Sequence, residues 1–564
     1  MGRALLTNLY RVTFRPTLFT VYEPLVELPG PEEVLSRLSL PFFFRNGRLY
    51  LLGEVEEEYL FKDGHPLKKL APELTAPTAE ELPTLFYSFV RALGLRKRFL
   101  LKRRRRIDRE RLLYFLPEER FLGERLVLSV RSLVVRRKPV AQEPVRNGWV
   151  LNVEDGQLYY AEQAGPEGVK LTSGKLLDAW SAYELLGSAG RPSFKLVKSL
   201  RSFYASVLKH YGWSISKEEP VRVRVSYARR LVDASGRSSL APEALLVRGK
   251  PFLKKKELSV RAVAVVQSSK ALMHDRLFLR RLKGFFYAKG VRLKVNGPTV
   301  VKAETRPEAR RALSPLLESF DEELLLAFLE PFNPPVERSK TLYEFIKRSC
   351  LKRGKPSQVV LTDSLKSKNF LKVLLSVYAQ SLLKTGSHPF LLKEPLEAEL
   401  FVGIEGRKPY LVKLFSAKGA FLGYRLAEEL KELEPLLNGV KGRVVFHADG
   451  QLEDEELKQL AGLPVETEVL EITPVKGVFF SVKSSKGAFY ELKPDGFLLS
   501  VSDRAAPLLV RRRRGTLPLS RHASFLLSLT LLSLPPSMPV TLKRAGFFRE
   551  LLRELPSGDV PFWL

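Results

Sequence analysis

The order of apolar segments between residues 396 and 564 constrains the fold more than any other feature of this chain. Three strand-like segments follow one another closely: LFVGIE, PYLVKLF and FLGYRL. The amphipathic segment RLAEELKELEPLL then predicts a helix, GRVVFHADG a strand that closes on a turn, and EDEELKQLAGL a second helix. Three consecutive strands, a helix and a further apolar strand that ends in an acid are the order of an RNase H-like domain.

The rest of the chain mixes strands and helices, so the sequence predicts an α/β multidomain fold. Short strands and hairpin turns dominate the first 95 residues. Further along, VRNGWVLNVEDGQLYY predicts a hairpin, and AWSAYELLG and SLRSFYASVLKHYGW predict helices. Helices then alternate with short apolar strands, which indicates an α/β layer. These changes of pattern divide the chain into six segments: 1–95, 96–145, 146–215, 216–274, 275–395 and 396–564.

The charge of the chain indicates its class of partner. Lysine and arginine number 93 against 62 aspartates and glutamates, a net charge of +31. So large a surplus would repel itself without a polyanion, and nucleic acid is the leading candidate. A membrane surface is the alternative, but no stretch approaches the ~18 uninterrupted apolar residues of a membrane-spanning helix.

The numbers of cysteines and histidines exclude an internal disulfide and a zinc finger. Cys350 is the one cysteine, so the chain has no internal disulfide, which fits a cytoplasmic location. Six scattered histidines and one cysteine lack the spacing of a zinc finger. Methionine and cysteine are scarce while lysine, arginine and glutamate abound, a composition typical of a thermophile.

The segment TLYEFIKRSCLKRGKPSQVVL and the helix after it carry the first functional constellation. Tyr343 and Lys347 are four residues apart and share a helix face, Gln358 opens a strand, and Lys384 ends the next helix. Convergent donors bind a phosphate, and an aromatic ring stacks on an unpaired terminal base. These residue types and spacings resemble the guide 5′-end pocket of Argonaute proteins. The resemblance implies that Tyr343 stacks on the first guide base while Lys347, Gln358 and Lys384 hold its phosphate.

Two acids form the second constellation. Glu405 and Asp449 end neighbouring predicted strands, where two-metal nucleases place the carboxylates that bridge Mg²⁺ ions. Both occupy positions that resemble those of the first two catalytic aspartates of the Argonaute PIWI domain. Without the resemblance, two exposed acids at strand ends would explain them equally well.

The second constellation departs from the family pattern, which uses four catalytic residues. Glu405 is one methylene too long at a site that tolerates little misplacement. Glu428 and Glu429 sit on a predicted helix, and the short loops leave no clear mobile segment to deliver the second residue. The fourth position falls on Gly546, which has no side chain. Only Asp449 is intact, and we therefore expect binding without cleavage.

The C-terminal segment LPPSMPVTLKRAGFFRELLR resembles the closing part of a PIWI domain, and the chain ends in PFWL. The resemblance implies that the terminal carboxylate of Leu564, together with Gln358, holds Mg²⁺ beside the guide phosphate. Lys476 resembles a family lysine near the guide backbone.

Two arginine runs add basic surface. The first, in RKRFLLKRRRRIDRERLL, predicts a wall of a phosphate-tracking groove, with a solvated face as the alternative. The second lies in the PIWI-like region and would line the guide–target channel, with a solvated loop as the alternative. The runs are Arg103, Arg104, Arg105 and Arg106, and Arg511, Arg512, Arg513 and Arg514.

Taken over the whole chain, the resemblance implies a long prokaryotic Argonaute. The six segments become an N domain, a linker, a reduced PAZ-like domain, a second linker, a MID domain and a PIWI domain. The implied function is guide-dependent recognition of complementary nucleic acid without cleavage, in defence against invading DNA or RNA. A nuclease that uses Glu405 and Asp449 and a guide-free coating protein are the alternatives. The nucleic acid of guide and target, the first guide base and an effector partner stay open.

Overall fold

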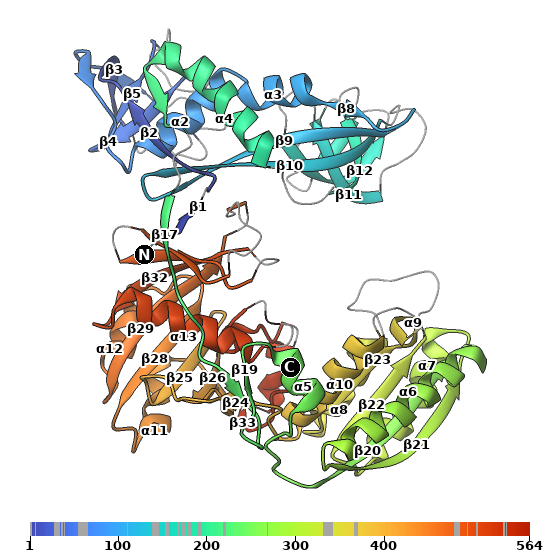
Figure 1. Ribbon diagram of the computed structural model, residues 1–564. Coiled ribbons are helices and arrows are strands. Elements are labelled where there is room, and N and C mark those ends of the chain that lie inside the picture. The colour runs from blue at the N-terminus through green and yellow to red at the C-terminus, as the bar shows by residue number, and fades with distance from the viewer. Residues whose placement is uncertain are drawn as a thin grey trace. The chain divides into compact units, whose positions relative to one another are not determined.

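The computed structural model describes the chain except for a set of short segments, and it divides the chain into two units (Figure 1). One unit comprises residues 3–222 and 475–483, and the other comprises residues 223–474 and 484–564. The residues outside the description are 1–2, 6, 27–33, 35–37, 39, 55–65, 110, 138–145, 153–156, 166–167, 172–175, 178–181, 189–193, 218–220, 268, 331–341, 366–369, 476, 479–485, 493–494, 503–505, 534–535, 537, 547, 556 and 564.

The N-terminal unit is built on a long antiparallel hairpin, β9 (Arg111–Leu122) and β10 (Arg125–Arg137). The segment expected as a linker at 96–145 therefore carries this hairpin and α3 (Leu95–Arg103). Helices α2 (Leu82–Ala92) and α4 (Phe194–Leu208) bury their apolar faces in a core that includes Trp213. Since this core is rich in packed rings, the tryptophan serves packing.

One helix prediction in this unit is wrong. The segment AWSAYELLG was expected to be helical, but its described residues form β15 (Ala182–Ser188). This strand pairs with β10 and with β11 (Arg146–Asn152). Ladder hydrogen bonds from two neighbours outweigh the local helical pattern.

In the second unit, a parallel sheet has the strand order β21-β20-β22-β23. Its strands are β20 (Glu257–Val266), β21 (Arg292–Lys302), β22 (Leu324–Leu329) and β23 (Ser357–Leu361). Helices α6 (Ser269–Ala288), α7 (Arg306–Ser319), α8 (Leu342–Lys352) and α10 (Phe370–Lys384) connect or follow these strands. All six residues of β22 are buried, as expected for a central parallel strand covered on both faces.

The sheet places the start of this layer earlier than the sequence indicated. The expected boundary at residue 275 falls inside α6, and β20 lies wholly upstream of it. The sequence of β20 alternates like a strand but does not say which sheet it joins, and its pairing with β21 and β22 assigns it to this layer.

The predicted RNase H-like order is confirmed. Strands β25 (Leu400–Glu405), β26 (Tyr410–Ser416) and β27 (Phe421–Ala427) form an antiparallel meander. Next, β28 (Arg443–Asp449) pairs parallel to β25, and β29 (Glu466–Pro474) pairs parallel to β28. Helix α13 (Leu519–Leu531) packs on this sheet through contacts such as Phe525 against Phe401.

The helix expected over RLAEELKELEPLL is replaced by shorter elements. Strand β27 continues to Ala427, and the chain then forms a 3₁₀ turn (Leu430–Leu433) and the short α11 (Glu434–Leu437). Glu428 and Glu429 therefore lie between strand and turn and not on a helix. Pairing of β27 with β26 explains the difference, because it holds the first residues of the segment in the sheet. Within the described residues, no helix combines the length and apolarity needed to cross a membrane.

Candidate functional site

The sequence-predicted pocket residues converge at the start of β23. Helix α8 brings the Lys347 ammonium, and the end of α10 brings that of Lys384. Both ammonium groups donate to the backbone carbonyl oxygen of Ser357, Lys384 at 3.0 Å. Lys384 also donates to Gln358 Oε1 at 2.9 Å. The structure thus brings together three of the four predicted residues through direct contacts.

The pocket places positive charge where it is buried from water. Lys347 and Lys384 are almost fully buried, and in the described part of the chain neither has a carboxylate within 4 Å. Burial lowers the pKa of Lys347 to about 8, and burial with repulsion from Lys347 lowers the pKa of Lys384 well below its ordinary value. Burial also lowers the pKa of Lys543 to about 8, and Lys543 adds to the repulsion on Lys384. Buried ammonium groups such as Lys347 and Lys384, which have no carboxylate partner among the described residues, are unfavourable, so the pocket is suited to an anion.

Aromatic rings and a cavity adjoin the cations. The Lys347 Nζ lies 5.7 Å from the centroid of the Tyr343 ring and 5.8 Å from that of Phe548. Tyr343 itself is 38% exposed. A cavity of about 300 Å³ begins at Gln358 and is lined further by Lys372 and Ser376. A phosphate and a stacked base would each find a matching surface here.

The two predicted carboxylates lie at the ends of adjacent strands. The last register pair of β25 and β28 is Ile404 with Ala448, and Glu405 and Asp449 follow it directly. Each carboxylate, however, is already bound to a cation. The buried Lys413 Nζ donates to Glu405 Oε2 at 2.7 Å. The Arg544 guanidinium donates to both oxygens of Asp449, at 2.7 and 3.0 Å.

The segment after the 3₁₀ turn Val540–Leu542 completes these contacts. The Ala545 N–H donates to both oxygens of Glu405, at 3.0 and 2.9 Å. Gly403 explains how this segment reaches the strand ends, since a Cβ at that position would collide with the Thr541 carbonyl oxygen. Gly546, the expected fourth position, lies directly after Ala545 and offers no side chain.

Sequence reasoning missed Lys413 and Arg544. Lys413 is a lysine within the apolar run YLVKLF, and a charge within a buried strand is a usable signal of a buried partner. Arg544 stands two residues before Gly546, and nothing in its local sequence indicates that it reaches Asp449. Burial lowers the pKa of Lys413 although Glu405 opposes the effect, and hydrogen bonds from Arg544 to Asp449 raise the pKa of Arg544.

Neither constellation provides a set of metal ligands among the described residues. No group of three or more His, Cys, Asp or Glu side chains in the described ranges is arranged for a metal. At the pocket, the oxygen of Gln358 already accepts from Lys384, and the other side chains are cations. Leu564 and Lys476 lie outside the described residues. The donor chemistry of the described side chains therefore does not fit the expected Mg²⁺, and we assign no role to it.

The arginine runs differ in their surroundings. Arg103–Arg106 are exposed at the end of α3 and in β8 (Arg105–Arg106) of the N-terminal unit. The second run lies in β32 (Leu508–Arg514), so a solvated loop is wrong for it. Arg512 pairs with Asp495 and Arg513 with Glu471, whereas Arg511 and Arg514 are exposed.

The C-terminal residues before Leu564 are packed. Phe562 and Trp563 are buried in a small core with Tyr424, and the Lys413 Nζ lies 5.8 Å from the Trp563 ring. The apolar end of the chain therefore packs beside the lysine that binds Glu405.

Comparison with known proteins gives a consistent result. No family model matches the chain. The protein argonaute of Aquifex aeolicus is 27% identical, with all of both chains aligned. A crystal structure of Aquifex aeolicus Argonaute with externally bound siRNA has a TM-score of 0.78 at 25% identity, and all of both chains are covered. Clostridium butyricum Argonaute, bound to a guide DNA and a 19-mer target DNA, shares the fold alone, with a TM-score of 0.66 at 12% identity over all of both chains. The chain is thus similar to long prokaryotic Argonautes over its full length, in sequence and in fold, and the strand order of its RNase H-like sheet agrees with that similarity.

Proposed function

We propose that this protein binds a guide strand by its 5′-phosphate and uses it to recognise complementary nucleic acid. The observation that carries the proposal is the pair of buried ammonium groups, Lys347 and Lys384, that share one carbonyl and lack a carboxylate partner in the described chain. A dianionic phosphate supplies the missing charge, and Tyr343 supplies a ring for the terminal base. The Argonaute domain order proposed from the sequence places this pocket in the MID domain and the carboxylates in the PIWI domain.

We also propose that target recognition occurs without cleavage. Lys413 and Arg544 place positive charge on both carboxylates where a two-metal nuclease would place its ions. With Gly546 at the fourth position, the described residues supply two neutralised carboxylates and no further donor at the site. The alternative, a guide-directed nuclease, requires both cations to leave their partners.

A cleavage assay separates the two functions. The protein is loaded with a 5′-phosphorylated guide and mixed with an end-labelled complementary target and excess Mg²⁺ or Mn²⁺ at elevated temperature. We expect a stable ternary complex and no discrete product, for the wild type and for Glu405→Asp alike. A guide-dependent product that disappears in Asp449→Ala would establish the nuclease instead.

Sequencing the nucleic acid that co-purifies with the protein tests the guide itself. Short strands with uniform 5′ ends support guide loading, and random fragments support a coating protein. The same experiment reports whether the strands are DNA or RNA. A cytoplasmic role in defence against invading nucleic acid belongs to the proposal, and enrichment of plasmid or phage sequences among the guides would support it.

A further inference from the structure

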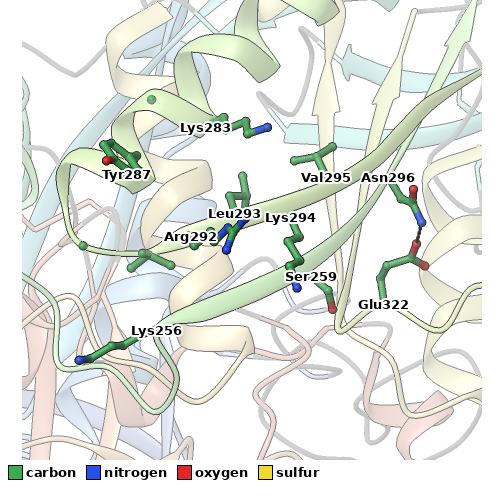
Figure 2. Close-up of a pocket in the computed structure, with 13 residues that line it drawn as sticks. Lys256, Ser259, Lys283, Tyr287, Arg292, Leu293, Lys294, Val295, Asn296 and Glu322 are labelled. Atoms are coloured by element: carbon green, nitrogen blue, oxygen red, sulfur yellow. Dashed lines mark hydrogen bonds between the residues drawn. The ribbon is translucent and has the colours of Figure 1, made fainter.

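A further cavity lies away from both constellations. It has a volume of about 1220 Å³ and is bounded by α6, β21 and the start of β20 (Figure 2). β21 is one edge of the parallel sheet and β23, which carries Gln358, is the other. Two strands, β20 and β22, separate them, so the cavity and the 5′-end pocket are distinct sites.

The walls of this cavity are basic. Figure 2 shows Lys283 and Tyr287 on the α6 side and Arg292 and Lys294 along the strand. Lys256 and Lys283 have no carboxylate within 4 Å in the described chain. Glu257 pairs with Lys294 at 2.5 Å and contacts Arg292 at 3.9 Å, so those two charges are partly balanced. Glu322, the acid on the wall, accepts a hydrogen bond from Asn296.

Basic charge continues along α6 beyond the cavity. Arg276, Arg280, Lys283 and Tyr287 are exposed and recur at spacings of four, three and four residues, so they share one helix face. At 1.5 Å per residue this face extends about 16 Å. That length accommodates several phosphates of one strand, and a single nucleotide would leave most of it empty.

Two features point to an occupant of the cavity. Tyr287 is 80% exposed as a residue, so its side chain is accessible for stacking. Gly284 destabilises the helix relative to alanine, yet a Cβ there would meet no atom within 4 Å. Internal packing therefore does not require a glycine at this position, and the absence of a side chain leaves room for a ligand close to the helix backbone.

We propose that α6 and β21 form a second nucleic-acid site, which binds a single-stranded segment outside the 5′-end pocket. Phosphates lie along Arg276, Arg280 and Lys283, and one base stacks on Tyr287 over the open surface of Gly284. An uncharged peptide could instead pair with the β21 edge, but it would make no use of the cations or the exposed ring.

The test uses the full chain loaded with a 5′-phosphorylated guide. A fluorescent 5′-hydroxyl oligo(dT) of 12 nucleotides, not complementary to the guide, is titrated and its Kd is measured by anisotropy. Tyr287→Ala should raise this Kd roughly 5- to 100-fold, the usual effect of losing one stacked base. Lys283→Glu and Gly284→Leu should also weaken binding. The matched controls Tyr227→Ala and Lys441→Glu, which change exposed residues outside the cavity, should leave it within twofold.

A second readout separates this site from guide loading. A 5-iodouracil oligonucleotide should cross-link to the tryptic peptide 284–289, which contains Tyr287, even if the guide pocket fails to bind. Unchanged Kd in Tyr287→Ala and Lys283→Glu, or cross-links only elsewhere, would overturn the proposal. Displacement by an equimolar amount of dTMP, or by an uncharged strand-forming octapeptide, would also overturn it.

Discussion

Replacing Lys347 by methionine is predicted to stabilise the guide-free protein while weakening its hold on a 5′-phosphate. Burial lowers the pKa of Lys347 from 10.5 to about 8. At ~1.4 kcal/mol per pKa unit, that shift destabilises the folded state by roughly 3 kcal/mol at pH 7, where the lysine is protonated both folded and unfolded. The cost shrinks as the pH rises from about 8 towards 10.5, because the folded protein releases its proton first.

Methionine fills a similar volume and removes this cost. It also removes the charge-assisted hydrogen bond to the Ser357 carbonyl, worth ~1.5–3 kcal/mol, but that oxygen keeps its bond from Lys384 at 3.0 Å. The net gain of roughly 1 kcal/mol should raise the melting temperature of the guide-free protein by about one to two degrees in calorimetry. The control is Lys352→Met, which replaces an exposed lysine on the same helix and should change the melting temperature little.

The same variant should lose affinity for phosphorylated guides. A charge-assisted hydrogen bond is worth ~1.5–3 kcal/mol, so the Kd of a 5′-phosphorylated oligonucleotide should rise roughly tenfold to a hundredfold. The Kd of its 5′-hydroxyl counterpart should barely change. If Lys347→Met melts at a lower temperature than the wild type while Lys352→Met does not, the buried lysine does not destabilise the folded protein and the reasoning fails.

Three further outcomes follow from the same structure. A bound phosphate dianion should raise the pKa of Lys347, so affinity for 5′-phosphorylated guides should fall above about pH 8, and a flat anisotropy profile from pH 6.5 to 9.5 would contradict this. Gly403→Ala should cost roughly 1–3 kcal/mol, because its Cβ would collide with the Thr541 carbonyl, and calorimetry should show a lower melting temperature than for Gly462→Ala, where a Cβ meets only ordinary contacts. Neutralising Arg103–Arg106 should flatten the dependence of log Kd on log salt by up to ~0.9 for each phosphate that the run neutralises in the wild type, and an unchanged slope would show that the run is a solvated face.

Much of the architecture could be predicted because its signals are local. The strand-like segments LFVGIE, PYLVKLF and GRVVFHADG form β25, β26 and β28, since short continuous apolar runs are typical of strands buried on both faces. Helix α8 likewise holds Tyr343 and Lys347 on one face, as their spacing of four predicts. Local patterns failed where pairing overrode them. AWSAYELLG became a strand between two neighbours, and the start of RLAEELKELEPLL stayed in the sheet.

The sequence alone determined which residues are present at each candidate site, including the glycine at 546 and the extra methylene of Glu405. Only the tertiary structure decided which groups those residues contact. Arg544 reaches Asp449 across 95 positions of sequence, and Ala545 reaches Glu405 across 140. The burial that depresses the pKa of Lys347 is likewise a property of packing, since the same lysine on an isolated helix would be solvated. Contacts between distant segments depend on how whole elements pack, and no window of sequence contains that information.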